Sequence, residues 1–208
     1  MNPRESPRLF KNPLLEWLSR PNAPAVIAGL VVTSWATFFY GLARTEFSFS
    51  TGVLVYFLGT GSFTLAEYLI HRYVYHQENY RDPSNWRFRI HGIHHKHPTD
   101  KERLALPLPL ALILSLLLFG LFNLLLGDRA FFFTPGFVTG YALYLTVHYL
   151  IHTRPAPKGG IRILWKHHHI HHHVDETRAF GVTSPLWDYV FGTMPISESN
   201  WQEAIEKQ

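Results

Sequence analysis

Long apolar stretches alternate with polar, histidine-rich segments along this chain of 208 residues. Four stretches are predominantly apolar, at about residues 25–43, 52–70, 104–126 and 131–151. A helix that spans a bilayer needs about 20 mostly apolar residues, and each stretch meets or nearly meets that length. Any one of them alone is also typical of a buried helix in a soluble bundle. Together they predict an all-α integral membrane protein with four transmembrane helices.

The basic residues fall on one side of this predicted membrane protein. An even number of spans returns the chain to its starting side, which then carries 17 of the 19 Lys and Arg residues. By the positive-inside rule this side is cytoplasmic. We therefore expect a multi-pass protein with both termini in the cytoplasm. We also expect a cytoplasmic segment at residues 1–24 and one domain at 25–208, with a helical cap formed by 71–103 and 152–208. Topology explains the basic charge, so we expect no nucleic-acid partner.

The beginning of the chain shows no secretory signal peptide, because it has no early apolar core and no small-residue cleavage site. With no organelle signal either, we expect the inner membrane of a bacterium. Cysteine is absent, which excludes disulfides, thiolate metal sites and iron–sulfur clusters. Any metal site must therefore use nitrogen and oxygen ligands.

Histidine is the unusual feature of the composition, with 14 copies. They concentrate on the predicted cytoplasmic side, in the motifs "HRYVYH" (His71, His76), "HGIHH" (His91, His94, His95), "HYLIH" (His148, His152) and "HHHIHHH" (residues 167–173). Spacings of three and four put side chains on one face of a helix. The first pair is five apart, at the end of the second spanning helix, an offset that suits ligands on either side of a helical turn.

The last motif allows two registers with the spacing of "HGIHH". We favour His169, His172 and His173; the alternative is His168, His171 and His172. In the favoured register, His167, His168 and His171 are left over, and the first two are available for hydrogen bonds that support a ligand.

A single pair of histidines four apart is more often incidental than metal-binding. Four motifs on one face change that balance, because neutral imidazole is the commonest ligand of first-row metals. Ten candidate ligands are too many for one ion and fit two ions with about five nitrogens each. We therefore predict a two-metal site.

Nitrogen ligands suit zinc, iron, copper or nickel. A hydrolytic zinc pair usually includes bridging carboxylates, and these motifs contain almost none. The site also opens towards the depth of lipid acyl chains. We expect iron, which activates O2 for attack on an unactivated C–H bond of a lipid; zinc could replace it in a purified sample with the same ligands.

These motifs, together with the segment "VDETRAFGVTSPLWDYVFGT", resemble the membrane fatty acid hydroxylase/sterol desaturase superfamily over about residues 67–193. The closest branch is the fatty acid 2-hydroxylases. The resemblance implies a cytoplasmic cap with a dimetal centre, and O2-dependent hydroxylation of an acyl chain at carbon 2. It implies the ligands His71, His76, His91, His94, His95, His148, His152, His169, His172 and His173. The haem-binding segment "HPGG" of fused cytochrome b5 domains is absent from the sequence, so we expect a separate electron donor, cytochrome b5-like or a ferredoxin with its reductase.

Several other residues are candidates for supporting roles. Glu67, four residues before His71, could orient that imidazole or bond to another helix, and Asp188 could hold a ligand by its second ring nitrogen. Asp100 and Arg103 could fix their loop by a salt bridge. Aromatic residues near the motifs could line a substrate path or anchor the chain at the membrane interface: Tyr73, Tyr75, Tyr149 and Trp187.

Rival functions remain open at this point. A carotenoid or sterol hydroxylase or a lipid desaturase would use the same chemistry. A membrane metal transporter would place polar ligands across the middle of the bilayer, whereas these motifs lie at one end of the spans. A metal-binding protein without catalysis is the remaining rival.

Overall fold

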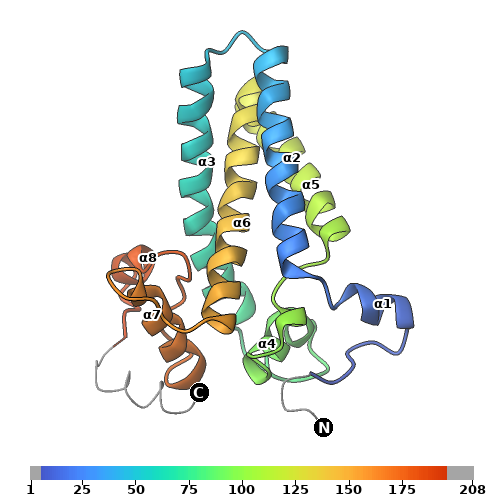
Figure 1. Ribbon diagram of the computed structural model, residues 1–208, viewed down its shortest axis with the longest axis vertical. Helices are drawn as coiled ribbons and strands as arrows, with labels where there is room; N and C mark the ends of the chain where they lie inside the picture. The colour runs from blue at the N-terminus through green and yellow to red at the C-terminus, as the bar shows by residue number, and fades with distance from the viewer. Residues whose placement is uncertain (1–5, 196–208) are drawn as a thin grey trace.

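Four long helices dominate the computed structural model, which describes residues 6–195 and contains no strand among them. They are α2 (Ala23–Arg44), α3 (Phe49–Ile70), α5 (Leu108–Leu126) and α6 (Ala130–Thr153), and they match the four apolar stretches of the sequence. Figure 1 shows them extending from one common base. The all-α prediction is confirmed for the described residues. By length and composition, three segments are candidate membrane spans: Ala23–Arg44, Phe49–Tyr75 and Lys101–Thr153, the last of which contains both α5 and α6.

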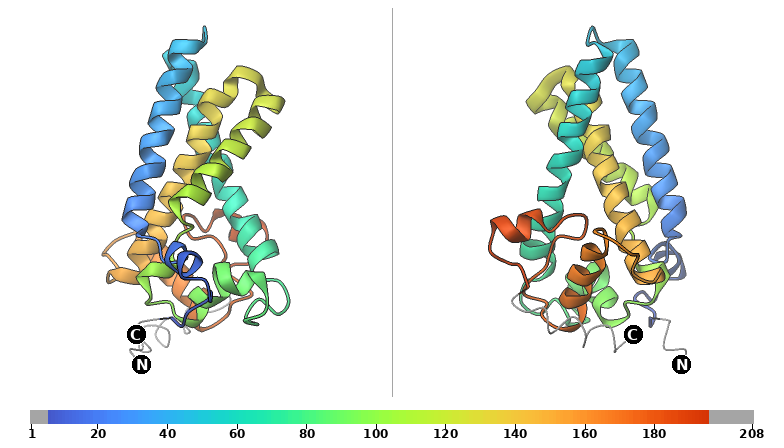
Figure 2. Two further views of the ribbon diagram at one scale, coloured as in Figure 1. Left: turned by 90° about the vertical axis from the view of Figure 1, so that its right-hand side faces the viewer. Right: turned by 60° about the vertical axis from the view of Figure 1, so that its left-hand side comes forward.

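The short elements gather at the base of the long helices, as both views of Figure 2 show. They are α1 (Pro13–Leu18), the π-helices η1 (His71–Tyr75) and η2 (Phe88–Gly92), α4 (Ile93–Lys96), the 3₁₀ turn η3 (Lys101–Arg103), α7 (Arg162–His173) and α8 (Leu186–Val190). One further 3₁₀ turn, η4 (Gly127–Arg129), joins α5 to α6 at the far end. All four histidine motifs therefore meet at the base.

Helix α6 is the centre of the bundle and packs against α2, α3 and α5. Glycines let α3 approach it closely: a Cβ atom on Gly59 would lie 2.2 Å from the carbonyl oxygen of Phe133, and one on Gly136 would lie 2.0 Å from that of Tyr56. Small residues of this kind are typical of helix contacts in membranes. In the same contact the Thr60 hydroxyl donates to the carbonyl of Gly136 at 3.0 Å. The first half of α6 is thus held closely against the middle of α3.

Helix α5 begins at Leu108, four residues later than the sequence pattern indicates. The cause is Pro107, which caps the helix, and Pro109 in its first turn. The residue before a proline is disfavoured in helical conformation, so the apolar residues 104–106 form an irregular lead-in to α5.

A buried polar network fastens the N-terminal segment to η3. Arg103 donates to Glu16 at 2.7 Å and to the Ser6 hydroxyl at 2.9 Å. Asp100 accepts from the backbone and hydroxyl of Ser6 and lies 3.7 Å from Arg20. Asp100 and Arg103 do fix their loop, but each does so through the N-terminal segment, whereas the sequence suggested a salt bridge between the two.

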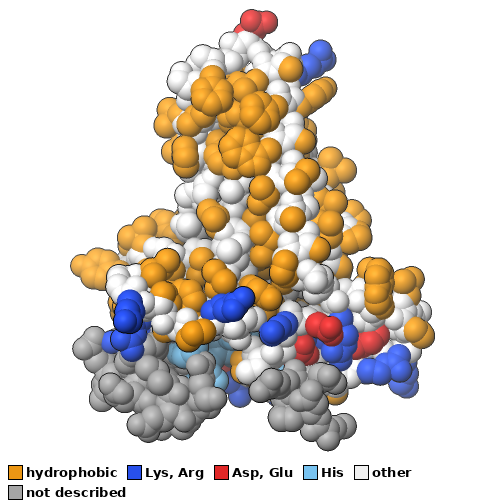
Figure 3. Space-filling model, viewed as in Figure 1, with side chains coloured by type: hydrophobic (Ala, Val, Ile, Leu, Met, Phe, Trp, Pro, Cys, Tyr) orange, Lys and Arg blue, Asp and Glu red, His pale blue; other side chains and the backbone are white. Residues whose placement is uncertain are grey.

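The exterior of the long helices is apolar. Outward-facing side chains such as Leu124, Leu116 and Phe57 expose 82%, 70% and 65% of their surface. In Figure 3 these hydrophobic side chains cover the long helices, while most Lys and Arg side chains on this face lie at the base. A soluble protein rarely exposes so large an apolar surface, so this exterior suits a lipid environment.

Candidate metal centre

Ten imidazoles converge at the base of the bundle in two groups of five. The first cluster is His71, His76, His91, His95 and His171. The second cluster is His94, His148, His152, His168 and His172. Within each cluster one ring nitrogen of every member lies within 4.8 Å of those of the other members. The clusters touch, since the rings of His95 and His172 stack with centroids 4.1 Å apart.

Each cluster takes two histidines from the end of a long helix. His148 and His152 lie one turn apart near the end of α6 and enter the second cluster together. His71 and His76 follow α3, where the backbone changes to a π-helix and the His76 amide bonds to the His71 carbonyl at 3.2 Å. This i→i+5 turn brings the two rings to 4.9 Å. His71 begins this turn and His76 caps its end, so the two lie on either side of one helical turn as the spacing suggested, and the π turn puts both rings into one cluster.

The remaining six histidines come from two copies of one pattern, a histidine followed by two more after gaps of three and four. His91 and His95 enter the first cluster, while His94 between them enters the second. The copy on α7 does the reverse: His168 and His172 enter the second cluster and His171 enters the first. The two motifs interlock, and each supplies ligand candidates to both clusters.

The register on α7 differs from the favoured one. His169 and His173 belong to neither cluster among the described residues, and His168 and His171 take their places. Trp165 explains the choice: it is buried against Ile151 of α6, and its indole donates to the Arg154 carbonyl at 3.1 Å. His168 and His172, three and seven residues after Trp165, lie on the same helix face. That face therefore meets the end of α6, where the second cluster forms.

Two backbone carbonyls orient rings of the first cluster. The Nδ1 atom of His71 donates to the carbonyl of Phe180 at 2.5 Å, and that of His171 donates to the carbonyl of Arg178 at 2.7 Å. A neutral imidazole carries one N–H group. Since Nδ1 holds the proton in both rings, their Nε2 atoms present lone pairs to the cluster.

Hydrogen bonds alone cannot satisfy all the ring nitrogens that meet at His91. Its Nε2 atom lies 3.1 Å from Nε2 of His71, 3.0 Å from that of His76 and 2.9 Å from that of His95. One N–H group can serve only one of these three neighbours. In the second cluster, His172 has no hydrogen-bond partner for either ring nitrogen among the described residues. Converging lone pairs of this kind fit a bound metal cation.

The rings outside the candidate spans are held neutral by their surroundings. Burial lowers the pKa of His94 to about 3. Burial, with the neighbouring imidazoles adding to it, also lowers the pKa of five others well below the ordinary value: His91, His95, His168, His171 and His172. Neutral imidazole is the form that binds metals. The donor set, all nitrogen, suits zinc, iron, copper or nickel.

Glu67 and Asp188 both hold the loop at residues 179–184, which we call the 179–184 loop. Glu67 accepts from the backbone amides of Val182 at 2.6 Å and Thr183 at 3.0 Å, and from the Thr183 hydroxyl. The sequence suggested that Glu67 could orient His71 directly. The ring is oriented instead by the carbonyl of Phe180, in the loop that Glu67 fixes.

Asp188 accepts from the amides of Phe180 at 2.8 Å and Gly181 at 2.7 Å, and from the Thr193 hydroxyl at 2.7 Å. Its imidazole partner is His167, at 3.0 Å, which belongs to neither cluster. Burial raises the pKa of Asp188, but the hydrogen bonds from His167, Thr193 and Gly181 outweigh burial and the pKa is lowered. The residue is thus an anionic support for the loop.

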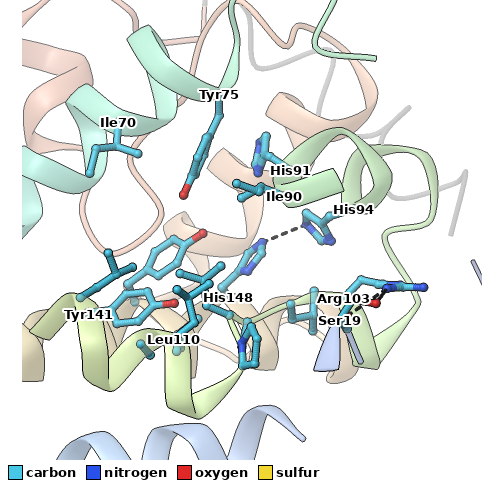
Figure 4. Close-up of a pocket in the computed structure, with 18 of the residues that line it drawn as sticks. Ser19, Ile70, Tyr75, Ile90, His91, His94, Arg103, Leu110, Tyr141 and His148 are labelled. Carbon is cyan, nitrogen blue, oxygen red and sulfur yellow. Dashed lines mark hydrogen bonds between the residues drawn. The ribbon is translucent and has the colours of Figure 1, made fainter. Parts of the chain in front are cut away.

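A cavity of about 630 Å³ borders both clusters. Its histidine wall comes from His71 and His91 of the first cluster and His94 and His148 of the second. Figure 4 shows the cavity running from Ile70 and Tyr141 at one end, past His91, His94 and His148, to Ser19 and Arg103 at the other. The rest of its lining is mostly apolar, from α3, α5 and α6. We call it the central cavity.

Three tyrosines line the central cavity, of which the sequence analysis named only Tyr75. The Tyr75 ring stacks on His91, with centroids 4.9 Å apart and 19° between the planes. Tyr144 stacks on His148 at 5.4 Å, and Tyr141 lies one turn earlier on α6. The spacing of 141, 144 and 148 on one predicted helix was the signal that could have found them. Tyr73, Tyr149 and Trp187, also considered from the sequence, do not line this cavity.

Comparisons with known proteins identify the family of this chain. The family model "Fatty acid hydroxylase" matches residues 54–193. The chain is 33% identical to the ceramide very long chain fatty acid hydroxylase scs7 of Schizosaccharomyces pombe, with 89% of this chain and 54% of the relative covered. It is 34% identical to human fatty acid 2-hydroxylase, with 90% and 56% covered. It is also 33% identical to the dihydroceramide fatty acyl 2-hydroxylase FAH1 of Arabidopsis thaliana, with 96% and 85% covered.

The chain therefore spans about half the length of the first two relatives and most of the third. A solved structure, full-length scs7p with only the hydroxylase domain visible, is similar with a TM-score of 0.78 and 31% identity, covering 89% of this chain and 71% of that one. The chain belongs to the fatty acid hydroxylase family.

Proposed function

From this family membership and the two histidine clusters, we propose that the protein is a membrane monooxygenase that hydroxylates a lipid acyl chain at carbon 2. One observation carries the proposal: ten imidazoles converge in two clusters, and an apolar cavity borders both. The cavity suits a long hydrocarbon, and the clusters suit the metals that such chemistry requires. The relatives named fatty acid 2-hydroxylase support the choice of carbon 2.

The proposed topology has four membrane crossings, by α2, α3, α5 and α6. The shortest, α5, has 19 residues, close to the 20 or so that a span needs. Residues 1–24 would form a cytoplasmic segment and 25–208 the hydroxylase domain, with the cap at 71–103 and 152–208 in the cytoplasm. Support comes from the basic residues at the histidine end and from the apolar exterior of the helices.

The two clusters would hold one metal ion each, with iron expected for catalysis and zinc able to occupy the same nitrogens. Bound iron would supply the activation of O2 that an unactivated C–H bond requires. A separate electron donor, cytochrome b5-like or a ferredoxin with its reductase, would provide the electrons.

The chain's own residues would place the substrate. Apolar side chains of α3, α5 and α6 would enclose the hydrocarbon and exclude water from it. The carbon next to the carbonyl would lie against the wall formed by His91, His94 and His148. Tyr75 and Tyr144, stacked on members of that wall, bring hydroxyl groups to the same part of the cavity.

Lipid mass spectrometry on cells that express the chain with a supplied reductase tests the proposal. We expect a new acyl species heavier by one oxygen atom, with fragmentation that places the hydroxyl at carbon 2. The variant His94→Ala, His95→Ala removes one imidazole from each cluster and should abolish it. His97→Ala, two residues further on and in neither cluster, is the matched control and should retain it.

Other products would overturn the proposal in defined ways. A species lighter by two hydrogens would identify a desaturase, and an oxygenated carotenoid or sterol would identify a different substrate class. If the purified chain contains metal but no lipid changes, a metal-binding or transport role replaces catalysis.

A further inference from the structure

The two ends of the central cavity differ in charge. The end among α3, α5 and α6 is apolar, while the end beside α1 and η2 includes the guanidinium groups of Arg89 and Arg103. Figure 4 shows Arg103 and Ser19 at this end, with the labelled histidines between them and Ile70. A molecule that fills the cavity therefore meets hydrocarbon first, then the histidine wall, then cationic side chains.

Arg103 is fully engaged within the protein. Its guanidinium donates to Glu16, to the hydroxyls of Ser6 and Ser19, and to the carbonyls of Ser19 and Pro7. The side chain is buried, with 6% of the residue exposed. Its role is to fasten the N-terminal segment, and it has little capacity left for a ligand.

Arg89 lines the same cavity but differs from Arg103 in exposure and in partners. It is exposed, lines the cavity, and makes no ion pair with a carboxylate among residues 6–195. Its guanidinium lies 5.5 Å above the ring of Phe10, which also lines the cavity. A cation over an aromatic face is held in place without losing its charge.

The carboxylates near this end of the cavity are all committed to other cations. Glu16 binds Arg20 and Arg103, and Glu102 binds Arg20. Asp100 lies against Ser6 and Arg20. Arg89 is therefore a cation whose charge no carboxylate of the described chain balances.

We propose that Arg89 binds the anionic headgroup of the substrate, a carboxylate or a phosphate, so that the lipid class on which this chain acts is acidic. The inference rests on the proposed function, because it concerns the same cavity. A guanidinium pairs with planar carboxylates and phosphates through paired N–H donors. Arg89 precedes His91 by two residues on η2, which puts the headgroup site beside the histidine wall. The Schizosaccharomyces pombe relative is named for ceramide, an uncharged lipid. The proposal therefore gives this chain a substrate class different from the one in that name.

Native mass spectrometry of the purified protein in uncharged detergent measures this binding without turnover. The probes are palmitic acid, dipalmitoyl phosphatidic acid and N-palmitoyl ceramide at equal concentration. We expect a single adduct of one or both acidic lipids, preferred over ceramide. Arg89→Gln should reduce that adduct roughly tenfold or more, the value of a hydrogen-bonded charge. Arg89→Lys should restore part of it.

Two controls make the result specific. Lys101→Gln removes the same charge from an exposed side chain that does not line the cavity, and should leave the adduct unchanged. Leu118→Trp adds bulk to the apolar arm of the cavity and should abolish the adduct. Unchanged metal content and elution volume show that each variant is folded.

An Arg89-dependent adduct with both acidic lipids, or with either one alone, agrees with the proposal. Which of the two lipids binds identifies the headgroup. Equal retention of ceramide, no effect of Arg89→Gln, or an adduct that survives Leu118→Trp would overturn it. Arg89-dependent binding without any hydroxylated product would overturn the proposed hydroxylase function but not the proposed Arg89 site. Hydroxylation of ceramide without Arg89-dependent binding would support the proposed hydroxylase function and overturn the proposed Arg89 site.

Discussion

The two histidine clusters contain the same number of imidazoles but are supported differently. In the first cluster, His71 and His171 are oriented by hydrogen bonds to the carbonyls of Phe180 and Arg178. In the second, the Nδ1 atoms of four members have no hydrogen-bond partner among the described residues: His94, His148, His168 and His172. Among the buried ring nitrogens of the first cluster, only Nδ1 of His95 lacks a partner.

Hydrogen bonds on the second ring nitrogen fix the orientation of a metal-binding histidine. The first cluster therefore has its shape set by the protein backbone. The second is shaped by ring packing against α6 and α7, and by the ion we propose it holds. If so, damage to the two clusters should arise from different parts of the chain, and four predictions follow that difference from the largest effect to the smallest.

His172→Ala should have the largest effect. Neither ring nitrogen of His172 has another partner, so the ring serves the proposed ion alone. Metal affinity of the second cluster should fall by more than roughly a hundredfold, beyond the tenfold to hundredfold typical of residues that only support a ligand. Elemental analysis of the purified chain should find about one ion in place of two. His169→Ala, on the same helix and in neither cluster, should keep both; the opposite pattern would restore the register favoured from the sequence.

Asp188→Ala should disturb the first cluster and spare the second. It leaves the buried amides of Phe180 and Gly181 without an acceptor and His167 without its partner. Each buried donor left without an acceptor costs about 1–3 kcal/mol, and thermal unfolding in detergent would measure the total. Asp188→Asn keeps one carbonyl oxygen and should cost less.

Metal analysis decides which cluster Asp188→Ala affects. The single variant Asp188→Ala should retain about one metal ion per chain, and the double variant with His172→Ala should retain none. If the double variant still holds one ion, both substitutions act on the same cluster and the comparison fails.

Removal of metal by a chelator should loosen the second cluster more than the first. Amide hydrogen exchange at the end of α6 and in α7 should rise roughly tenfold more than exchange in the 179–184 loop, a difference of about 1.4 kcal/mol in local opening. The loop retains its bonds to Glu67 and Asp188 whether or not metal is bound. Equal rises in both regions would show that the loop does not support the first cluster independently.

Glu67→Gln should have the smallest effect. The amide oxygen can still accept from Val182 and Thr183, and the Thr183 hydroxyl can rotate to accept from the new N–H group. We expect a loss of about 1 kcal/mol in unfolding free energy and unchanged metal content. Glu67→Ala, which removes the acceptor, should cost more and weaken metal binding by the first cluster. A larger effect from the glutamine variant would indicate that the charge itself is required.

Much of this arrangement could be predicted from the sequence. The apolar stretches correspond to α2, α3, α5 and α6, because spans of this length leave little choice but helix. All seven histidines of the first three motifs lie in the two clusters. Histidine is itself a signal for metal binding, and spacings of three and four bring side chains together on any ordinary α-helix.

The rest depends on features that periodicity does not signal. A π turn at His71 has no distinct hydrophobic pattern, so its effect on His76 was not foreseen. The run of six histidines offers two registers with the same spacing, and only the packing of Trp165 on Ile151 selects one. Every residue has a backbone carbonyl whatever its side chain, so the role of the carbonyls of Phe180 and Arg178 appears only in three dimensions.

The interlocked motifs also constrain how the protein is made. The first cluster needs His171 and the second needs His168 and His172, so neither is complete until α7 has been synthesised and has docked. The helices that carry the other ligand candidates precede α7 in the chain, and by then they would already be inserted in the membrane. Loading of the proposed metal ions would therefore come late in biogenesis, and a ribosome that stalls before α7 would release a chain unable to assemble either site.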